Sequence, residues 1–480
     1  MITDIDQTYS CDELTDVSQL EKYCSHSPNI SAYECVQELS STDCPLTVKQ
    51  NIAIKYLNYW ITNNTVSDEF PLDLEQLKNW LELQNNQACK DFQTYLERRK
   101  NLGKREYFGG IANAFEFLIK IAPTKRVDGA WLYSLCHQWK NPAFEEAIGI
   151  YLDELGTGIA ALNHVYIYDN LMNRLGLNDF DYILDDSFFI QAALQLSFAY
   201  APSDYIPEII GFNLGYEQLP LHLLISNYEL KELGIDAQYF NLHITVDNFD
   251  SGHAQSAFRS VKKIMDLYPD RDAFLQRVKI GYYLNDVGVG STQIVKQLHL
   301  GSLVEKILVK KAKVGRLVHS EKCRIEGRDI NSWLDTEQST KDFLNTLIKR
   351  KWINIGQDAQ NSRFWKMIND AHGIMFGVFN SAEKRFIHDW IEQDGVGDYN
   401  DRLKLKHLEV PFQCQALTDI DPQTILLKQR YHSEADILTK IGYLIDYLSP
   451  HQHHTQSGMW ATKEFTQILY PKLAERFEKL

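Results

Sequence analysis

The chain contains the stretch Leu242-His-Ile-Thr-Val-Asp-Asn-Phe-Asp-Ser-Gly-His253, which brings two imidazoles and two carboxylates into about three helical turns. His243 and Asp247 are four residues apart. On a helix that turns by about 100° per residue they project from one face, so their side chains can converge on one metal ion. The spacing therefore predicts a pair of metal ligands on a helix.

His253 does not share that face on a regular helix. It lies six residues after Asp247, which turns it about 120° away. A local break at Ser251-Gly252 can bring it back, because glycine is a poor helix former. Asp250 is an alternative ligand to Asp247, since Asp250 and His253 are also at a same-face spacing. We favour Asp247; the competing interpretation of the whole stretch is a capped helix end with solvated aspartates.

A second pair of candidate ligands, Glu154 and His164, is too far apart to meet on one helix. Ten residues would separate them by about 15 Å along the axis and about 80° around it. Gly156-Thr-Gly158 lies between them and can let the chain loop out. We therefore predict that the helix is interrupted there and that Glu154 and His164 approach each other. The alternative is an exposed glutamate at a helix start and a core histidine.

The apolar helix predicted from Pro207 to Leu224 carries two acids with different surroundings. Glu208 stands at the first turn, where it complements the helix dipole. Glu217 lies among apolar residues, where a buried carboxylate requires a cation, so it is the better ligand candidate. Gly211 and Gly215 are four residues apart and would allow another helix to approach closely, or make room for a metal or substrate.

Glu116 is the last candidate and lies between two phenylalanines in an apolar helix. Its partner is either a metal ion or Lys120, four residues later on the same face. Taken together, the carboxylates and imidazoles form an oxygen and nitrogen donor set that suits iron or manganese better than thiolate-bound zinc. Inward-facing Glu and His side chains from several helices are also how dimetal carboxylate sites are built in bundles.

The overall composition is that of an acidic protein without a membrane-spanning stretch. The 480 residues include 64 acidic and 49 basic side chains, for a formal charge of −15. This charge argues against generic affinity for nucleic acid or anionic membranes, and no apolar run approaches the length of a span. The chain opens without a leader-like segment and its eight cysteines contain no Cys-x-x-Cys pair. We therefore expect free thiols and a cytoplasmic location.

Apolar positions recur at helical period over much of the chain, which predicts a mainly α fold in three regions. Residues 1–100 form a helical N-terminal extension and residues 101–285 a helical bundle. Residues 286–480 form a mixed, mostly helical C-terminal region, in which two helices and a turn are compatible with a winged-helix module. The basic stretch 306–316 is expected to be an exposed helix face. The histidines of His451-Gln-His-His454 are expected in a solvated loop.

The bundle resembles the heme-oxygenase-like diiron oxidases, also called iron-containing redox enzymes. The resemblance covers about residues 105–270. It rests on the motifs Ala122-Pro-Thr-Lys-Arg-Val-Asp-Gly-Ala-Trp-Leu132, Asp153-Glu-Leu-Gly-Thr-Gly with Asn163-His164, Pro207-Glu-Ile-Ile-Gly-Phe-Asn-Leu-Gly-Tyr-Glu217 and His243-x3-Asp247-x5-His253. Many members have His-x3-Asp-x2-His, so this chain carries three extra residues before the last histidine.

The resemblance implies a seven-helix bundle that holds two Fe(II) ions and uses O2 as co-substrate. The implied ligands are Glu116, Glu154, His164, Glu217, His243, Asp247 and His253. The implied reaction is oxidation of a small metabolite, by N-oxygenation or oxidative C–C cleavage of an amino-acid-like or fatty-acid-like substrate. The sequence does not choose among these reactions.

Two other functional hypotheses remain open. One is a non-catalytic protein that senses a metal or ligand and binds a partner or DNA through its C-terminal region. The other is a cofactor-free hydrolase or lyase, for which Cys136 is the only cysteine in the bundle. The expected partner is a small-molecule substrate; nucleic acid and membranes are not expected partners, and a homodimer is left open.

Overall fold

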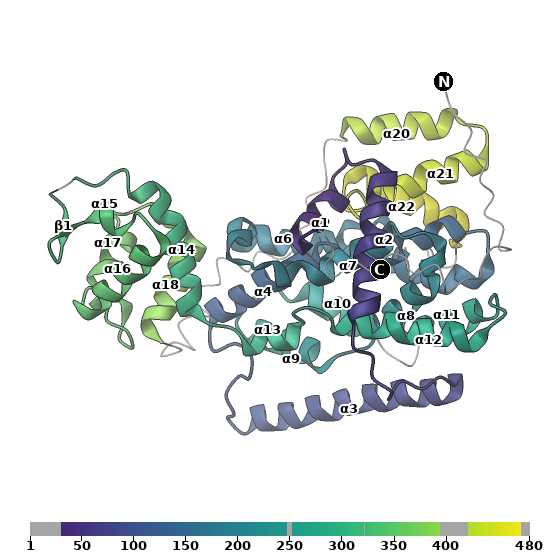
Figure 1. Ribbon diagram of the computed structural model, residues 1–480, viewed down its shortest axis with the longest axis horizontal. Coiled ribbons are helices and arrows are strands. Elements are labelled where there is room, and N and C mark those ends of the chain that lie inside the picture. Colours follow the sequence, from purple (N-terminus) through teal and green to yellow (C-terminus); the bar gives the residue numbers. More distant parts are fainter. Residues whose placement is uncertain (1–29, 247–251, 321, 394–420, 472–480) are drawn as a thin grey trace.

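The computed structural model describes residues 30–246, 252–320, 322–393 and 421–471, and these residues are almost entirely helical (Figure 1). The predicted mainly α fold is thus confirmed. Within the described ranges the only sheet is a short antiparallel hairpin of β1 (Arg324–Ile325) and β2 (Arg328–Asp329). None of the described helices combines the length and apolarity needed to cross a bilayer. Asp247 and Asp250 lie outside the described residues.

The central region is a set of helices joined by short turns. Their bounds are α4 (Ile111–Lys125), α5 (Glu145–Glu154), α6 (His164–Leu175), α7 (Ile190–Ala199), α8 (Ile206–Tyr216), α9 (Leu221–Glu232), α10 (Gln238–Val246), α11 (His253–Met265) and α12 (Arg271–Tyr283). The helix predicted over 207–224 is in fact two helices, because α8 ends at Tyr216 and Pro220 precedes the first residue of α9. Proline lacks the N–H needed to continue a helix and is tolerated at its start.

The tightest helix pair in this region is α8 with α12. A Cβ placed on Gly211 would lie 2.0 Å from the carbonyl oxygen of Val278, and one on Gly281 would lie 2.1 Å from that of Glu208. Only glycine fits at such a backbone separation. The close approach expected at Gly211 is therefore confirmed.

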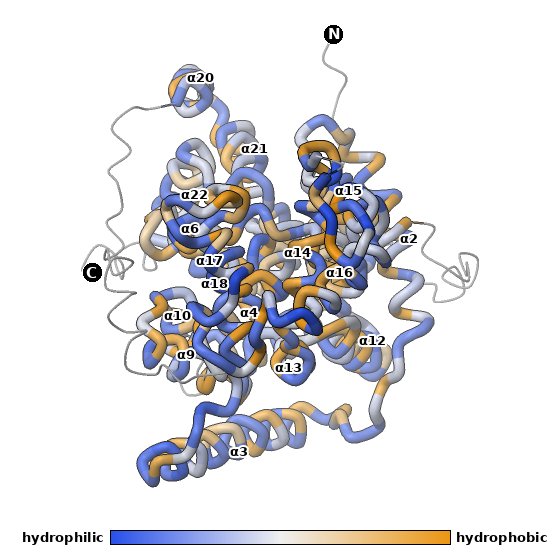
Figure 2. Tube along the Cα trace, turned by 90° about the vertical axis from the view of Figure 1, so that its left-hand side faces the viewer, coloured by the Kyte–Doolittle hydropathy of each residue, from blue (hydrophilic) through white to orange (hydrophobic). Residues whose placement is uncertain are grey.

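The N-terminal helices cover two sides of the central region. They are α1 (Ala32–Ser40), α2 (Leu46–Asn63) and α3 (Leu74–Lys100). Helices α1 and α2 pack on α7, whereas α3 runs along the lower edge in Figure 1 and contacts α9. Helix α3 is largely hydrophilic (Figure 2), and only Leu77, Leu81 and Tyr95 are buried on it.

A separate lobe, on the left in Figure 1, follows the central region. Its helices are α14 (Leu300–Gly315), α15 (Ile330–Trp333), α16 (Glu337–Lys349), α17 (Arg363–Asn369) and α18 (Ser381–Glu392), preceded by α13 (Ser291–Lys296). This lobe shares a buried apolar core with the central region, in which Ile307 and Phe386 pack with Phe115. Basic side chains of α14 add contacts at its edge: Lys306 pairs with Asp185 at 3.2 Å and Lys310 lies over the ring of Tyr182. Part of the basic stretch 306–316 is therefore used within the chain.

The C-terminal helices return to the central region, above it in Figure 1. They are α20 (Pro422–Ser433), α21 (Ile437–Tyr447) and α22 (Gln456–Leu469). Leu444, Leu448 and Phe465 share one apolar core with Ile148 and Tyr151 of α5. This core places the end of the chain against the helix that ends in Glu154.

Candidate metal centre

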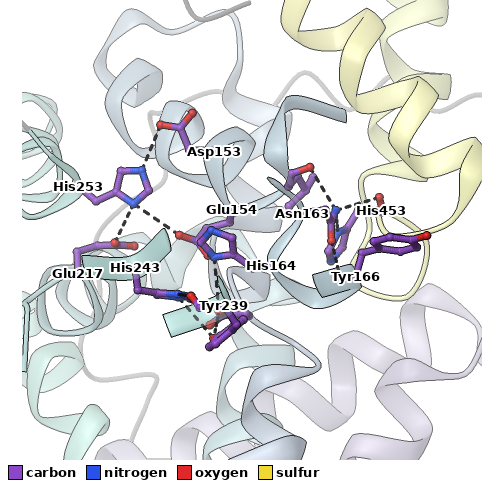
Figure 3. A network of polar contacts seen from close by, with 12 residues as sticks. Asp153, Glu154, Asn163, His164, Tyr166, Glu217, Tyr239, His243, His253 and His453 are labelled. Atoms are coloured by element: carbon purple, nitrogen blue, oxygen red, sulfur yellow. Dashed lines mark hydrogen bonds and ion pairs between the residues drawn. The ribbon is translucent and has the colours of Figure 1, made fainter. Parts of the chain in front are cut away.

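Five of the predicted ligands meet inside the central region, together with one acid that was not predicted (Figure 3). Their ligand atoms form two groups, in each of which the atoms lie within 4.8 Å of one another. The first group is Asp128, Glu154, His164 and His243, and the second is Glu154, Glu217 and His253. All six side chains are buried, and Glu154 belongs to both groups.

The predicted interruption between Glu154 and His164 is present. Helix α5 ends at Glu154 and α6 begins at His164. Between them Gly156, Thr157 and Gly158 all have positive φ angles, of 62°, 49° and 85°. A helix cannot pass through such a run, because the left-handed region disfavours residues with a Cβ. The loop brings His164 Nδ1 to 2.5 Å from Glu154 Oε2.

The orientation of His243 is set by the helix that carries it. Its Nδ1 lies 3.0 Å from the carbonyl oxygen of Tyr239, so Nδ1 carries the hydrogen and donates it. The other nitrogen, Nε2, then faces Asp128 Oδ2 at 3.1 Å. A lone pair on Nε2 and a carboxylate oxygen can lie this close only with a proton or a metal ion between them. The hydroxyl of Tyr239 also donates to Asp128.

His253 is oriented in the same manner by a carboxylate. Its Nε2 lies 3.1 Å from Asp153 Oδ2, which leaves Nδ1 facing Glu217 Oε2 at 3.2 Å and Glu154 Oε1 at 3.5 Å. A carboxylate on the far nitrogen of a histidine is the usual support of a metal-bound imidazole. Asp153 thus has the position of a residue that orients a metal-binding histidine. His253 is the first residue of α11, directly after the N-cap Gly252.

Charges in the first group are strongly coupled. Burial alone would raise the pKa of Asp128, but Lys125, His164 and His243 together hold it well below its usual value. Burial alone would lower the pKa of His164, yet Glu154 and Asp128 raise it to about 10. In the absence of metal, a proton on the imidazole therefore supplies positive charge that these buried carboxylates require.

The residues fit a metal ion. Two of the buried atoms that face each other, Glu154 Oε2 and His164 Nδ1, have no hydrogen-bond partner of good geometry. Such atoms are rare in folded proteins unless an ion or water satisfies them. The donors of both groups are carboxylate oxygens and imidazole nitrogens, with no thiolate, which is the set that suits iron or manganese.

Asp128, which was not predicted as a ligand, lies in the first group with Glu154, His164 and His243. Asp128 follows α4 in the turn before the 3-10 helix η3 (Ala130–Gln138). Asp128 lies within the motif 122–132 that carried part of the family resemblance, but no regular spacing relates it to the other candidate ligands.

Two other acids are satisfied by neighbours outside both groups. Glu116 pairs with Lys120 at 2.7 Å and accepts from the backbone N–H of His299 at 3.1 Å. Glu208 forms a two-pronged ion pair with Arg277, with both contacts at 2.6 Å. Of the two acids at the ends of α8, Glu217 therefore reaches the site and Glu208 does not.

The C-terminal histidines are not solvated as expected. His453 is 1 % exposed and packs beside the loop that ends in His164. Burial lowers the pKa of His453 well below its usual value. The expectation failed because helices α20 to α22 fold back onto the central region, which no local pattern in the sequence indicates.

Residues 115–284 match the family described as iron-containing redox enzymes. The matched segment contains every residue of the two groups. The resemblance inferred from the sequence motifs is thus confirmed for this part of the chain, and it supports iron-dependent oxidoreductase chemistry there. No curated protein and no solved structure matches the chain.

Proposed function

Taking the match of residues 115–284 to iron-containing redox enzymes as the premise, we propose that this protein is a non-heme diiron oxidase or oxygenase. Its substrate in this proposal is a small metabolite, either amino-acid-like or fatty-acid-like. The observation that supports it most directly is the shared carboxylate of Glu154, whose two oxygens face the two groups of donors separately.

In the proposal each iron position has its own set of ligands. Asp128, His164 and His243 would hold the first position together with Glu154, and Glu217 and His253 would hold the second, also together with Glu154. Asp247, which lies outside the described residues, is proposed as a further ligand. Two Fe(II) ions bring four positive charges, of which Asp128, Glu154 and Glu217 offset three. When bound, the irons supply the electrons that activate O2.

One further polar side chain beside the two groups is that of Tyr216, whose pKa is influenced by the charges of Asp128, Glu154 and Glu217. Tyr216 accepts a hydrogen bond at 2.6 Å from Gln195 Nε2, so its own hydroxyl hydrogen is available to donate. Burial, helped by the negative charge of Asp128, raises the pKa of Tyr216 well above its usual value. Tyr216 therefore stays protonated and is a candidate hydrogen-bond donor to a substrate bound beside the two groups.

The hypothesis of a cofactor-free hydrolase or lyase fits less well. Cys136 is fully buried and burial raises the pKa of its thiol, so it lacks the features of a nucleophile. A metal-sensing protein without catalysis would bind iron at the same residues but would not consume O2. The two remaining possibilities therefore differ in a measurable reaction.

The test is anaerobic reconstitution of the apo-protein with Fe(II), an iron count, and mixing with O2 while recording the visible spectrum. We expect two irons per chain and a transient absorption band after O2 is added. His243→Ala should remove about one iron, whereas His222→Ala, at a half-buried histidine outside both groups, should leave the count unchanged. A protein that binds no iron, or that binds it equally well after His243→Ala, would refute the proposal. Iron binding without O2 consumption would favour the sensor.

A further inference from the structure

The C-terminal segment lies directly on the loop that joins two of the proposed ligands. This segment, residues 448–463, includes the turn between α21 and α22 and is outside the family match. Its contact partner is the loop from Glu154 to His164, with the 3-10 turn η5 (Gly156–Gly158) at its centre. The question is whether this contact only adds stability or also sets the geometry of the ligands.

Asn163 connects the two sides of the contact (Figure 3). It is fully buried and directly precedes His164. Its Nδ2 lies 3.2 Å from the carbonyl oxygen of Leu155, the residue after Glu154. It also lies 3.1 Å from Nδ1 of His453, which is closer than the backbone carbonyl oxygen of His453 at 3.4 Å. One side-chain amide thus links the backbone beside both ligands to a single histidine of the C-terminal segment.

The direction of the hydrogen bond to His453 follows from the other contacts of Asn163. Oδ1 of Asn163 already accepts from the backbone N–H of Tyr166 at 3.0 Å, which fixes the amide with Nδ2 toward His453. Nδ2 can only donate, so Nδ1 of His453 must be the acceptor and the ring must be neutral. The hydrogen bond from Asn163 Nδ2 therefore requires an acceptor at the Nδ1 position of the His453 ring.

Two further contacts hold the segment to the same loop. A Cβ placed on Gly158 would lie 2.3 Å from the carbonyl oxygen of Met459, so α22 begins in direct backbone contact with the loop. Tyr151, one turn before Glu154 on α5, donates its hydroxyl to the carbonyl of Leu448. The C-terminal segment therefore touches the ligand-bearing backbone before, within and at the end of the loop.

We propose that His453 is a positioning residue of the metal centre, and that through Asn163 it holds Glu154 and His164 at the separation that binds the first iron. The proposal rests on the iron site proposed above. It assigns to the C-terminal region a role in metal affinity that the family match does not cover. Loss of a supporting hydrogen bond of this kind lowers metal affinity by about 10- to 100-fold in metal sites. We expect the lower end, about tenfold, because His453 acts through Asn163.

The experiment compares three variants of the full-length chain by anaerobic Fe(II) titration of the apo-protein. His453→Leu keeps similar volume but has no acceptor, whereas His453→Asn places a carbonyl oxygen near the position of Nδ1. His454→Leu is the matched control, because His454 packs against His453 but makes no hydrogen bond to Asn163. We expect His453→Leu to lower the affinity of one of the two iron positions about tenfold. His453→Asn should restore most of it, and His454→Leu should have no effect.

A second measurement uses the unaltered protein, so it does not depend on how the variants fold. If the C-terminal contact strengthens iron binding, iron must strengthen the contact by the same factor. Amide hydrogen exchange in residues 448–463 should therefore slow when Fe(II) binds, by about tenfold where local opening limits exchange.

The outcomes are distinguishable. Two irons bound equally tightly by wild type and His453→Leu, with exchange in 448–463 unaffected by iron, would refute the role of His453 and leave the iron site standing. A loss in His453→Leu that His453→Asn does not restore would show that packing of the ring matters and not its acceptor, which also overturns the proposal. A wild-type protein that binds no iron would refute the proposed function itself.

Discussion

Glu208 and Glu217 are two buried acids at the two ends of one helix, and replacing each by glutamine should have opposite effects. Glu208 lies at the start of α8, with its side chain 3 % exposed and paired with Arg277. Glu217 is the C-cap of the same helix and faces His253 Nδ1 at 3.2 Å. Glutamine keeps the shape of glutamate and removes its charge, so the pair of variants separates a structural ion pair from a metal ligand.

For Glu208→Gln we expect loss of stability without loss of iron. Removing one partner of a buried ion pair costs about 3–5 kcal/mol, because the other charge stays behind without compensation. The side chain of Arg277 is 26 % exposed, so some water reaches it, and burial raises the pKa of Glu208 despite the ion pair. The low end, about 3 kcal/mol, therefore applies as an upper bound. At about 2 °C per kcal/mol for a large domain, the unfolding temperature should fall by up to roughly 6 °C.

For Glu217→Gln we expect loss of iron with little change in the apo-protein. In the apo-protein the substitution removes one of three clustered negative charges, which relieves repulsion. In the iron-bound protein the substitution removes a charged ligand. Loss of a residue that only supports a ligand lowers metal affinity by up to roughly 100-fold, or about 2.8 kcal/mol, so the affinity of the second position should fall by more than this. The iron count should then drop from two to one at micromolar Fe(II).

The assay is a thermal unfolding scan of each variant with and without Fe(II), together with an iron count. Glu208→Gln should retain two irons and unfold earlier in both scans, whereas Glu217→Gln should unfold earlier only in the presence of iron. Equal iron counts for Glu217→Gln and wild type would refute the assignment of the second position. Loss of iron in Glu208→Gln would show that the acid at the start of α8 had been misassigned.

Two further predictions concern acids that hold parts of the fold together. Glu116→Gln should weaken the contacts of this side chain with Lys120 and with the backbone of His299 at the start of α14. The chain around residue 299 should then become more sensitive to limited proteolysis, while the iron count stays at two. Loss of an iron would instead indicate that Glu116 is a ligand. Glu146 joins α5 to α11 through Arg259 and Lys263; burial alone would raise its pKa, but these two cations hold it below the usual 4.5. A carboxyl whose pKa is lower in the folded state stabilises the fold at pH values above its pKa in the unfolded state. That stabilisation is lost as the pH falls through its pKa in the folded state. The difference in unfolding temperature between wild type and Glu146→Gln should therefore be present at pH 6 and should shrink below pH 4.5, and a difference that persisted at pH 3 would contradict this account.

The features that the sequence predicted correctly are those fixed by local geometry. The approach of Glu154 to His164 followed from two glycines between them, because the conformational limits of a helix act over a few residues. Gly211 likewise indicated a close helix pair, although its partner α12 could not be named. Where a feature depended on a few neighbouring residues, the expectation could be derived from the residues themselves.

The features that the sequence did not predict depend on contacts between distant segments. For Glu116 the sequence left open a metal ion or Lys120 as the partner; Lys120 pairs with it, and the backbone N–H of His299, far along the chain, adds a contact that no local pattern indicates. Asp128 looked unremarkable because it lies in a turn with no periodic relation to His164 or His243. His453 was expected in solvent because nothing local shows that α21 and α22 fold back over α5.

All the described members of the two groups lie at or beside helix ends. Glu154 is the last residue of α5, His164 and His253 are the first of α6 and α11, Glu217 follows α8, and His243 is in the last turn of α10. Inside a helix, one inserted residue rotates everything after it by about 100° and would turn a ligand away. Between helices, an insertion changes only the length of a connection, at a cost that grows slowly with length. A centre built from helix ends can therefore tolerate changes in the length of the connections between its helices, while the helices that carry its ligands keep their phase.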